Sequence, residues 1–415
     1  MKKLLGIHRN EDEFSFIVQE NGRIFVEHGN EKNINDFANS KLILKRDEMI
    51  RDPLGEEDVE GEGVFDFRYG PVTSGVGEAG IYHLFTYGER ILDVKIDTSY
   101  KRRELDLKMK GKNVNEGLRL AQSVCGNFTI SHSLAFVRAV ENALNVKIPR
   151  VSELLRAVAL ELERMYNHMY VISRLASAAA QLVLSSHLQG LFEALLVVNE
   201  KFSKSRFLRD FVKIGGVAFV PKNNSLNGII TEVERISNDF SDLFERSLES
   251  RNYVDRLHST ATLKAEDAEK IGLTGPSLRA CNVLEDLRRR EGVYATLETI
   301  TDEEGDSLSR MEVRAREIIQ SAKFVIKTLR EIDDEKPIND SIRVEDSQGL
   351  GACESPSGSV VYLLNLKGGK IEDVYISTPS VFGFAAIAHS IRENIFTDFP
   401  FAVESYGVNF ADAAR

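Results

Sequence analysis

The chain has 415 residues, 42% of them apolar and 28% charged, as is typical of a soluble globular protein with one large or two medium domains. Its formal net charge of -11 argues against a general nucleic-acid binder, because neutralising phosphates requires clustered Lys and Arg. The three cysteines, Cys125, Cys281 and Cys353, have no partner at CxxC spacing. This spacing opposes a disulfide framework and excludes an iron–sulfur cluster held by this chain alone.

The first 66 residues are predicted to form a small β-rich extension. Three strand-like runs, "FSFIVQ", "RIFVEH" and "KLILK", are separated by turn-forming segments. An acidic loop at 52–63 follows, and "GIYHLFTYGERILDVKID" then predicts two antiparallel strands joined at "YGER". We therefore divide the chain into an N-terminal extension, residues 1–66, and a main domain, residues 67–415.

From about Asn113 the hydrophobic period becomes helical. Between Leu154 and Ile172 apolar residues recur at i, i+3, i+4 and i+7, which predicts a long helix with a buried face. The stretch Leu175–Phe192 has no charged residue but contains Ser, Gln and His, so we expect a helix buried inside a bundle and not a membrane span. Further helices are expected at 114–145, 183–205, 227–252, 262–272, 276–290 and 303–333.

After "DEKPIND" the pattern returns to strand. The run "GSVVYLLNLKGGKIEDVYIST" predicts a hairpin that turns at Lys367–Gly369, and a final helix is expected near 380–395. The order of strands, a long helical middle, strands and a last helix indicates an α+β fold. We expect a helical bundle with small antiparallel β-sheets beside it.

Common catalytic and nucleotide-binding motifs are missing from the sequence. No phosphate-binding GxxxxGK[ST] loop, no GxGxxG turn between a strand and a helix, and no GxSxG elbow occurs. The eight histidines are dispersed, so we expect no all-protein zinc centre.

Charged residues at helical spacing are a further feature of the middle of the chain. Glu161, Arg164 and His168 fall on one face of the long predicted helix, which also carries a wide apolar stripe. Because a buried charge must be paired, this face indicates either a structural ion-pair network or a proton path.

A second charged face lies on the helix predicted at 303–333. Asp306, Arg310, Arg314 and Glu317 follow one another at intervals of three or four residues. Taken alone, this helix is expected to present a solvated charged face.

Seven segments share their order and spacing with one family of redox proteins. They are "GPVTSGVGE" at 70–78, "CGNFTISHS" at 125–133, "ELERMYNH" at 161–168, "GLTGPSLRA" at 272–280, "EGDSLSRMEVRAREIIQS" at 304–321, "CESPSGSVVY" at 353–362 and "DFPFAVESYGVNFADAAR" at 398–415. Together they resemble the large subunit of membrane-bound group 4 nickel–iron hydrogenases and the related 49-kDa subunit of respiratory complex I. The resemblance implies their fold for the main domain.

The nickel ligands of these hydrogenases are four thiolates, two from each of two CxxC pairs. The matching positions here are Cys125, Phe128, Asn409 and Asp412, so one thiolate of the four remains. A phenyl ring cannot ligate a metal, and an amide and a carboxylate are poor substitutes for soft ligands. We therefore predict no nickel–iron centre, no metal held by this chain and no hydrogen turnover.

The resemblance also implies roles for three further positions. Glu78 matches a family glutamate that is implicated in proton transfer, and His132 matches a histidine that lies toward the partner subunit's nearest iron–sulfur cluster. Asp412 replaces a nickel ligand, so with Glu78 it is a candidate proton donor. We predict Glu78, His132 and Asp412 as the catalytic residues.

Complex I uses the vacated cavity to bind a quinone head group, and a quinone is therefore a candidate ligand here. The family histidine that contacts the quinone is Thr73 in this chain. Tyr406 lies in a segment that should line the cavity and is a candidate hydrogen-bond donor. Thr73, Cys125, Phe128, Tyr406 and Asn409 are predicted to line the cofactor-binding cavity.

Two functions remain open on this resemblance. The first is a catalytic-type subunit of a membrane-associated oxidoreductase, which passes electrons from a 4Fe-4S cluster in a partner subunit to a quinone or another small acceptor. The second is a non-catalytic structural subunit that bridges the iron–sulfur and membrane arms of such a complex. Both imply an iron–sulfur small subunit and ion-translocating membrane subunits as partners, no nucleic acid, and a peripheral position on the cytoplasmic face of the cell membrane.

Overall fold

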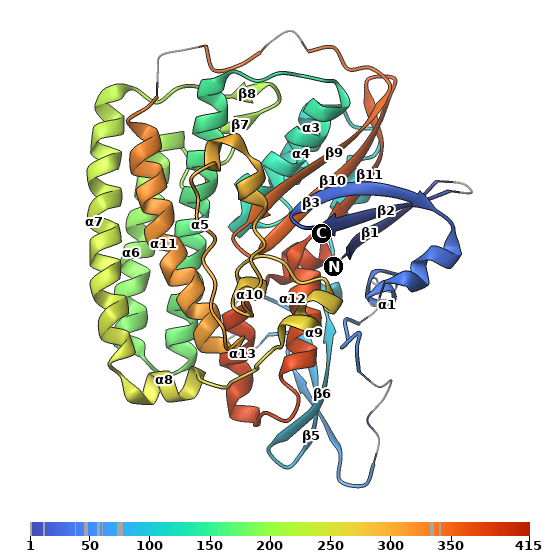
Figure 1. Cartoon of the computed structure of the whole chain (residues 1–415), viewed down its shortest axis with the longest axis vertical. Helices are drawn as coiled ribbons and strands as arrows, with labels where there is room; N and C mark the ends of the chain where they lie inside the picture. The colour runs from blue at the N-terminus through green and yellow to red at the C-terminus, as the bar shows by residue number, and fades with distance from the viewer. Residues whose placement is uncertain are drawn as a thin grey trace.

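The structure is a computed structural model of the full chain. It describes residues 2–10, 13–37, 39–44, 49–55, 59, 61–72, 78–332, 336–339 and 342–415. These residues form a helical bundle on one side and small antiparallel sheets on the other, which confirms the predicted α+β class (Figure 1).

Four long helices make the bundle. They are α5 (Arg150–Ala178), α6 (Leu182–Ser203), α7 (Asn223–Leu248) and α11 (Ser307–Leu329), and they lie side by side in Figure 1. The predicted long helix is α5, which packs against both α6 and α11. It is buried on most of its surface and so forms the axis of the bundle.

The sheet next to the bundle has the strand order β11-β10-β9. Its strands are β9 (Ser347–Ser355), β10 (Gly358–Lys367) and β11 (Lys370–Ser377), and β10–β11 is the predicted hairpin. Helix α4 (Thr129–Ala143) covers one face of this sheet. The close approach needs Gly351 on β9, because a Cβ atom there would come within 2.2 Å of the Ala135 carbonyl oxygen.

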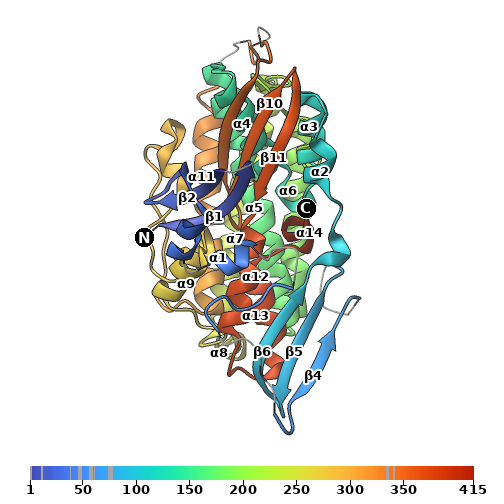
Figure 2. The same ribbon diagram turned by 90° about the vertical axis from the view of Figure 1, so that its right-hand side faces the viewer.

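The N-terminal sheet has the order β1-β2-β3 and lies beside β9–β11 (Figures 1 and 2). It consists of β1 (Lys3–Asn10), β2 (Glu13–Glu20) and β3 (Arg23–Gly29). The segment "KLILK", predicted as a strand, instead contributes to helix α1 (Ser40–Leu44), so that prediction was wrong. The Asn39 side chain donates hydrogen bonds to Leu4 and Ile271 carbonyls, and the turn that follows it closes as a helix.

A third sheet, ordered β4-β5-β6, extends beyond the bundle at the lower end of Figure 2. Its strands are β4 (Phe65–Tyr69), β5 (Ile81–Tyr87) and β6 (Arg90–Asp97). The β5–β6 pair is the hairpin expected at "YGER". The proposed division of the chain at residue 66 falls inside β4.

Two helix predictions need correction. The charge-free stretch 175–192 is not one buried helix, because α5 ends at Ala178 and α6 begins at Leu182 after a left-handed Ala180. Leu182 and Val183 are 65% and 75% exposed, so the first turn of α6 lies on the surface of the described structure. By length and composition alone, α6 is also a helix that could cross a membrane.

The helix predicted at 114–145 is likewise two helices, α3 (Val114–Ala121) and α4. The break holds Cys125 in an extended conformation, with φ -143°, before a 3-10 turn, η3 (Gly126–Phe128). This break places the cysteine segment at the start of α4.

A small two-stranded sheet pairs β7 (Val212–Lys213) with β8 (Gly216–Val217). The remaining helical elements are η1 (Glu31–Asp36), η2 (Ser99–Lys101), α2 (Leu105–Met109), α8 (Arg251–Leu257), α9 (Ala265–Ile271), α10 (Pro276–Arg279), η4 (Leu287–Arg290), η5 (Gly292–Tyr294), α12 (Pro379–Ser390), η6 (Phe396–Asp398), α13 (Phe399–Tyr406) and α14 (Phe410–Ala414).

Candidate functional site

The start of α4 meets the C-terminal helix α14 through a buried hydrogen bond between a histidine and a carboxylate. His132 Nε2 lies 2.9 Å from Asp412 Oδ1, and both side chains are fully buried. The second carboxylate oxygen of Asp412 accepts the backbone N–H of Ser380 at 3.1 Å. Two of the predicted catalytic residues are thus in direct contact.

The other nitrogen of this histidine contacts a tyrosine that the sequence analysis missed. His132 Nδ1 lies 3.0 Å from the Tyr362 hydroxyl, and the two rings meet edge to face. With a carboxylate at Nε2, a neutral imidazole carries its hydrogen there and accepts the Tyr362 O–H at Nδ1. Burial first, and then Asp412, raise the pKa of Tyr362, so the phenol keeps its proton.

Glu78 and the cysteine segment both reach the same C-terminal helix. Glu78 Oε2 accepts the backbone N–H of Ala411 at 3.0 Å, so its carboxylate satisfies an amide in the first turn of α14. The amide of Asn127 donates to Asn409 Oδ1 at 2.9 Å, which ties the turn that carries Phe128 to the tail. The structure therefore brings the two segments with the altered ligand positions together.

The donor atoms at these positions do not fit a thiolate nickel centre. Burial, followed by the charges of Asp412 and Glu78, raises the pKa of Cys125 well above its usual value, so the thiol stays protonated. Phe128 is fully buried and offers no ligand atom. Asn409 and Asp412 already accept the hydrogen bonds described above. Among the described residues no group of three or more His, Cys, Asp or Glu side chains could hold a metal.

One predicted cavity residue, Tyr406, contacts other elements than this cluster. The Tyr406 hydroxyl lies 2.9 Å from Ser390 Oγ, and the Arg310 guanidinium stacks over its ring at 4.0 Å. These contacts of the Tyr406 side chain thus come from α12 and α11. Thr73 lies outside the described residues.

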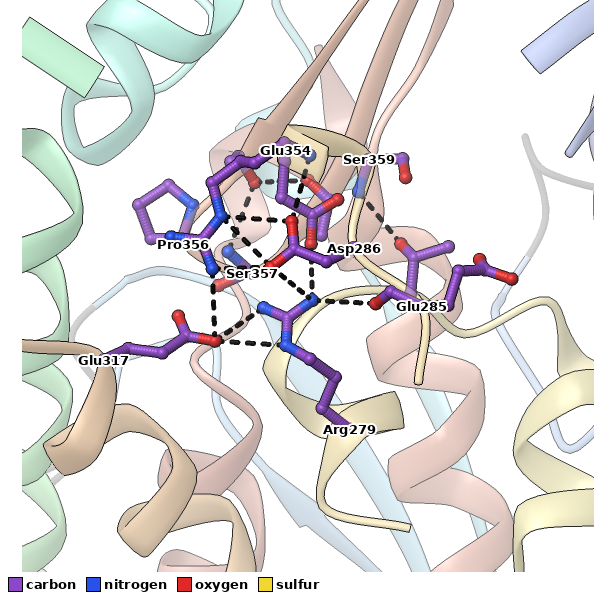
Figure 3. Close-up of polar contacts among 12 residues, drawn as sticks. Arg279, Glu285, Asp286, Glu317, Glu354, Pro356, Ser357 and Ser359 are labelled. Carbon is purple, nitrogen blue, oxygen red and sulfur yellow. Dashed lines mark hydrogen bonds and ion pairs between the residues drawn. The ribbon is translucent and has the colours of Figure 1, made fainter. Parts of the chain in front are cut away.

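A dense network of buried charges lies between α5, α11 and the loop between β9 and β10 (Figure 3). At its centre Glu317 accepts hydrogen bonds from Arg279 at 2.7 Å and from His168 at 2.9 Å. Arg279 also donates to Glu354 at 2.8 Å and lies 3.7 Å from Asp286. All of these charged side chains are almost completely buried.

For the helix taken alone, the charged face of α11 was expected to be solvated, and that expectation was wrong. Asp306, Arg310, Arg314 and Glu317 are at most 1% exposed. Arg310 donates to the Gly305 and Ala261 carbonyls, and Arg314 to the Pro356 and Tyr406 carbonyls. The face points inward because these partners come from the loops packed around α11.

The charged face of α5 joins the same network. Glu161 accepts hydrogen bonds from Arg164 and Arg288, each at 3.2 Å, and from the Ser321 hydroxyl at 2.6 Å. This arrangement agrees with the interpretation as a structural ion-pair network. Burial lowers the pKa of His168 to about 3, so this histidine is neutral and donates its Nε2–H to Glu317.

Glu163 is a second residue that the sequence analysis missed. It lies on α5, and its carboxylate accepts the backbone N–H groups of Ile130 and Ser131 at 2.6 and 2.9 Å, in the first turn of α4. Burial raises its pKa to about 7, against the hydrogen bonds that lower it. The pattern "ELER" contains this residue, but its inward direction depends on how α4 crosses α5.

Comparison with known proteins relates the chain to subunits of membrane redox complexes. A family model described as the 49-kDa subunit of respiratory-chain NADH dehydrogenase matches residues 190–345, and one described as nickel-dependent hydrogenase matches residues 103–177. Each model matches less than half of the chain, and the chain is thus similar to both kinds of subunit over two different segments.

Individual relatives agree with this assignment. The membrane-bound hydrogenase subunit alpha of Pyrococcus furiosus is 27% identical over 81% of this chain and 84% of its own length. The carbon monoxide-induced hydrogenase of Rhodospirillum rubrum is 23% identical over 81% of this chain and 95% of its own. A chain of the archaeal membrane-bound sulfane sulfur reductase superposes with a TM-score of 0.80 at 19% identity, over 85% of this chain and 99% of that one, which shows the shared fold.

Proposed function

We propose that this chain is the catalytic-type subunit of a membrane-associated oxidoreductase complex without a nickel–iron centre. It accepts electrons from an iron–sulfur cluster of a partner small subunit and passes them to a quinone or another small acceptor. Ion-translocating membrane subunits complete the complex, which lies peripherally on the cytoplasmic face of the membrane. Support comes from relatives named as a membrane-bound hydrogenase subunit and as subunits of NADH-quinone oxidoreductase.

The observation that carries this proposal is the buried Tyr362–His132–Asp412 chain where a nickel ligand would stand. Reduction of a quinone consumes two electrons and two protons, so the site must deliver protons as well as admit electrons. His132 links Asp412 to Tyr362 through its two ring nitrogens, and on this proposal a proton passes to the acceptor along this hydrogen-bonded chain. Glu78 is half-buried beside the first turn of α14, where it accepts the Ala411 N–H, and it is the second candidate proton donor.

The test uses the purified complex and two nearly isosteric variants, Asp412→Asn and Glu78→Gln. Each should lower the rate of quinone or polysulfide reduction by at least tenfold, since proton transfer by a positioned group contributes about 10²–10⁴-fold. Glu266→Gln, an exposed carboxylate on α9, serves as the control and should leave turnover unchanged. Unchanged turnover in both site variants, with the complex intact, would refute the assignment of these residues.

A structural subunit that bridges the iron–sulfur and membrane arms is the second candidate. It is favoured by one observation, the full burial of Phe128 together with the saturation of both Asp412 oxygens, as in an ordinary core. On this hypothesis Asp412→Asn lowers stability or assembly, while complexes that do assemble reduce the acceptor at the normal rate.

A further inference from the structure

A polar groove of about 1590 Å³ lies where the N-terminal sheet meets the main body. Its walls come from the tip of the β2–β3 hairpin, from α4, from the start of α5, from the η4–η5 segment and from β9. Six arginines and four glutamates line it, although the whole chain has a formal net charge of -11. The groove is therefore a local surplus of positive charge on an acidic protein.

The deeper arginines of the groove are already neutralised. Arg138 forms a two-pronged ion pair with Glu291, at 2.9 and 2.6 Å, and Arg156 does the same with Glu141. These pairs build the walls and leave no net charge there.

The surplus lies at the rim. Arg23, at the start of β3, and Arg289, on η4, are exposed and make no ion pair within the described part of the chain. Arg290 next to it donates only to the Asn21 carbonyl oxygen of the hairpin turn, which is no counter-charge. Arginines from two distant segments thus face solvent along one side of the groove.

The same side of the groove is an open sheet edge. The strand order β1-β2-β3 leaves β3 with a neighbour on one side only, and Arg23, Ile24 and Phe25 of this strand line the groove. The two-residue turn at Asn21 and Gly22 has φ angles of 49° and 70°, so the flanking pair Glu20–Arg23 is a hydrogen-bonded pair of the ladder.

Alternation along β3 then directs the backbone groups of Ile24, Val26 and His28 away from β2. Among the described residues none of these groups makes a backbone hydrogen bond outside the β2–β3 ladder. Open sheet edges of this kind are templates for an added strand.

We propose that this groove binds an acidic, extended segment of a neighbouring subunit, which adds as a fourth strand to β3 and pairs its carboxylates with Arg23 and Arg289. The backbone edge supplies affinity and the rim arginines supply the preference for acidic side chains. The proposal rests on the proposed function only in that the chain works within a complex.

The shape of the groove favours a peptide over a small anion. Its volume exceeds the roughly 300–1,000 Å³ of typical small-molecule pockets. The exposed arginines come from two separate segments, Arg23 from β3 and Arg289 from η4. Glu20 also lines the groove and would repel a compact polyanion, whereas an extended chain can place its charges away from it.

The test measures binding of a short synthetic peptide of alternating Glu and Thr, carrying a fluorophore, to the full chain by fluorescence anisotropy. The peptide should bind at low salt and more weakly at high salt, and a Lys-Thr peptide should not bind. The double variant Arg23→Glu, Arg289→Glu should weaken binding at least tenfold. The matched control is Arg209→Glu, an exposed arginine outside the groove, which should leave binding unchanged.

A second variant separates strand addition from simple charge attraction. Val26→Pro removes an outward N–H at a position where an edge strand tolerates proline, and it leaves the groove charges intact. It should weaken peptide binding at least fivefold. The proposal is overturned if the Glu-Thr peptide does not bind or if Val26→Pro binds it with normal affinity. It is also overturned if the Arg23→Glu, Arg289→Glu variant weakens peptide binding no more than Arg209→Glu does. Displacement by low concentrations of pyrophosphate would identify a small-anion site instead. No redox turnover enters these measurements, so they do not depend on the electron acceptor.

Discussion

Replacing Glu317 by Gln tests whether the buried charges are a stabilising network. The variant keeps the volume of the side chain but removes a charge whose side chain is fully buried and that accepts hydrogen bonds from Arg279 and His168. Burial alone would raise the pKa of Glu317, but Arg279 and Arg288 outweigh it and hold the pKa well below its usual value. The carboxylate is therefore ionised, and Gln leaves buried guanidinium groups without their counter-charge.

Removing one partner of a buried ion pair costs about 3–5 kcal/mol, and we expect a loss in this range for Glu317→Gln. The assay is urea denaturation of the chain followed by circular dichroism, with Glu266→Gln as a surface control. Glu266 pairs with Lys270 in solvent, so its replacement should shift the midpoint very little.

The pH dependence gives an independent check on the same residue. Because the folded pKa of Glu317 lies below its unfolded value of 4.5, its contribution to stability is complete above pH 4.5 and fades as the pH falls below it. The difference in free energy of unfolding between wild type and Glu317→Gln should therefore shrink as the pH falls below 4.5. A loss below about 1 kcal/mol at neutral pH, the range of exposed pairs, would refute the view that these charges are desolvated and paired.

Three further outcomes follow from the site and the network. Phe128→Ala should lower the free energy of unfolding by about 3–5 kcal/mol in urea denaturation, because it leaves a cavity in a fully buried position. The folded pKa of His168 is lowered to about 3 from 6.5, so stability is lost as the pH falls below 6.5. His168→Gln should flatten the slope of the unfolding free energy against pH, by an amount that approaches about 1.4 kcal/mol per pH unit at pH 5. Cys125, Cys281 and Cys353 are buried with raised thiol pKa values, so iodoacetamide should label them only after denaturation, and rapid labelling of the native chain would contradict the burial.

Local pattern predicted the elements whose partners are close in sequence. The hairpin of β10 and β11 follows from alternating residues on either side of two glycines, Gly368 and Gly369, which have positive φ angles as the turn requires. Helix α5 follows from its apolar period, since its buried stripe is continuous. These signals need no knowledge of the rest of the fold.

Distant partners decided the features that the sequence did not predict. Four charges at helical spacing suit a solvated face and a buried network equally well. Glu317 is paired in the interior by Arg279, which comes from the remote helix α10. Tyr362 appears in the sequence as one aromatic residue in an apolar strand, and only the crossing of α4 over β10 reveals its bond to His132. The meeting of the cysteine segment with the C-terminal tail was expected from the family resemblance and not from local pattern.

The charge network and the altered ligand site are joined through the C-terminal tail. Arg314 donates to the Tyr406 carbonyl at 2.7 Å, where α13 ends, and to His168 Nδ1 at 3.2 Å. Gly407 then turns the chain with φ 63°, and a Cβ atom there would lie 2.8 Å from the Arg314 guanidinium. The tail that carries Asp412 begins at this fixed point, so the position of its carboxylate depends on Arg314. A change in the network can therefore reach the His132–Asp412 pair without a change in either residue, which a double-mutant cycle between Glu317→Gln and Asp412→Asn would detect as non-additive free energies of unfolding.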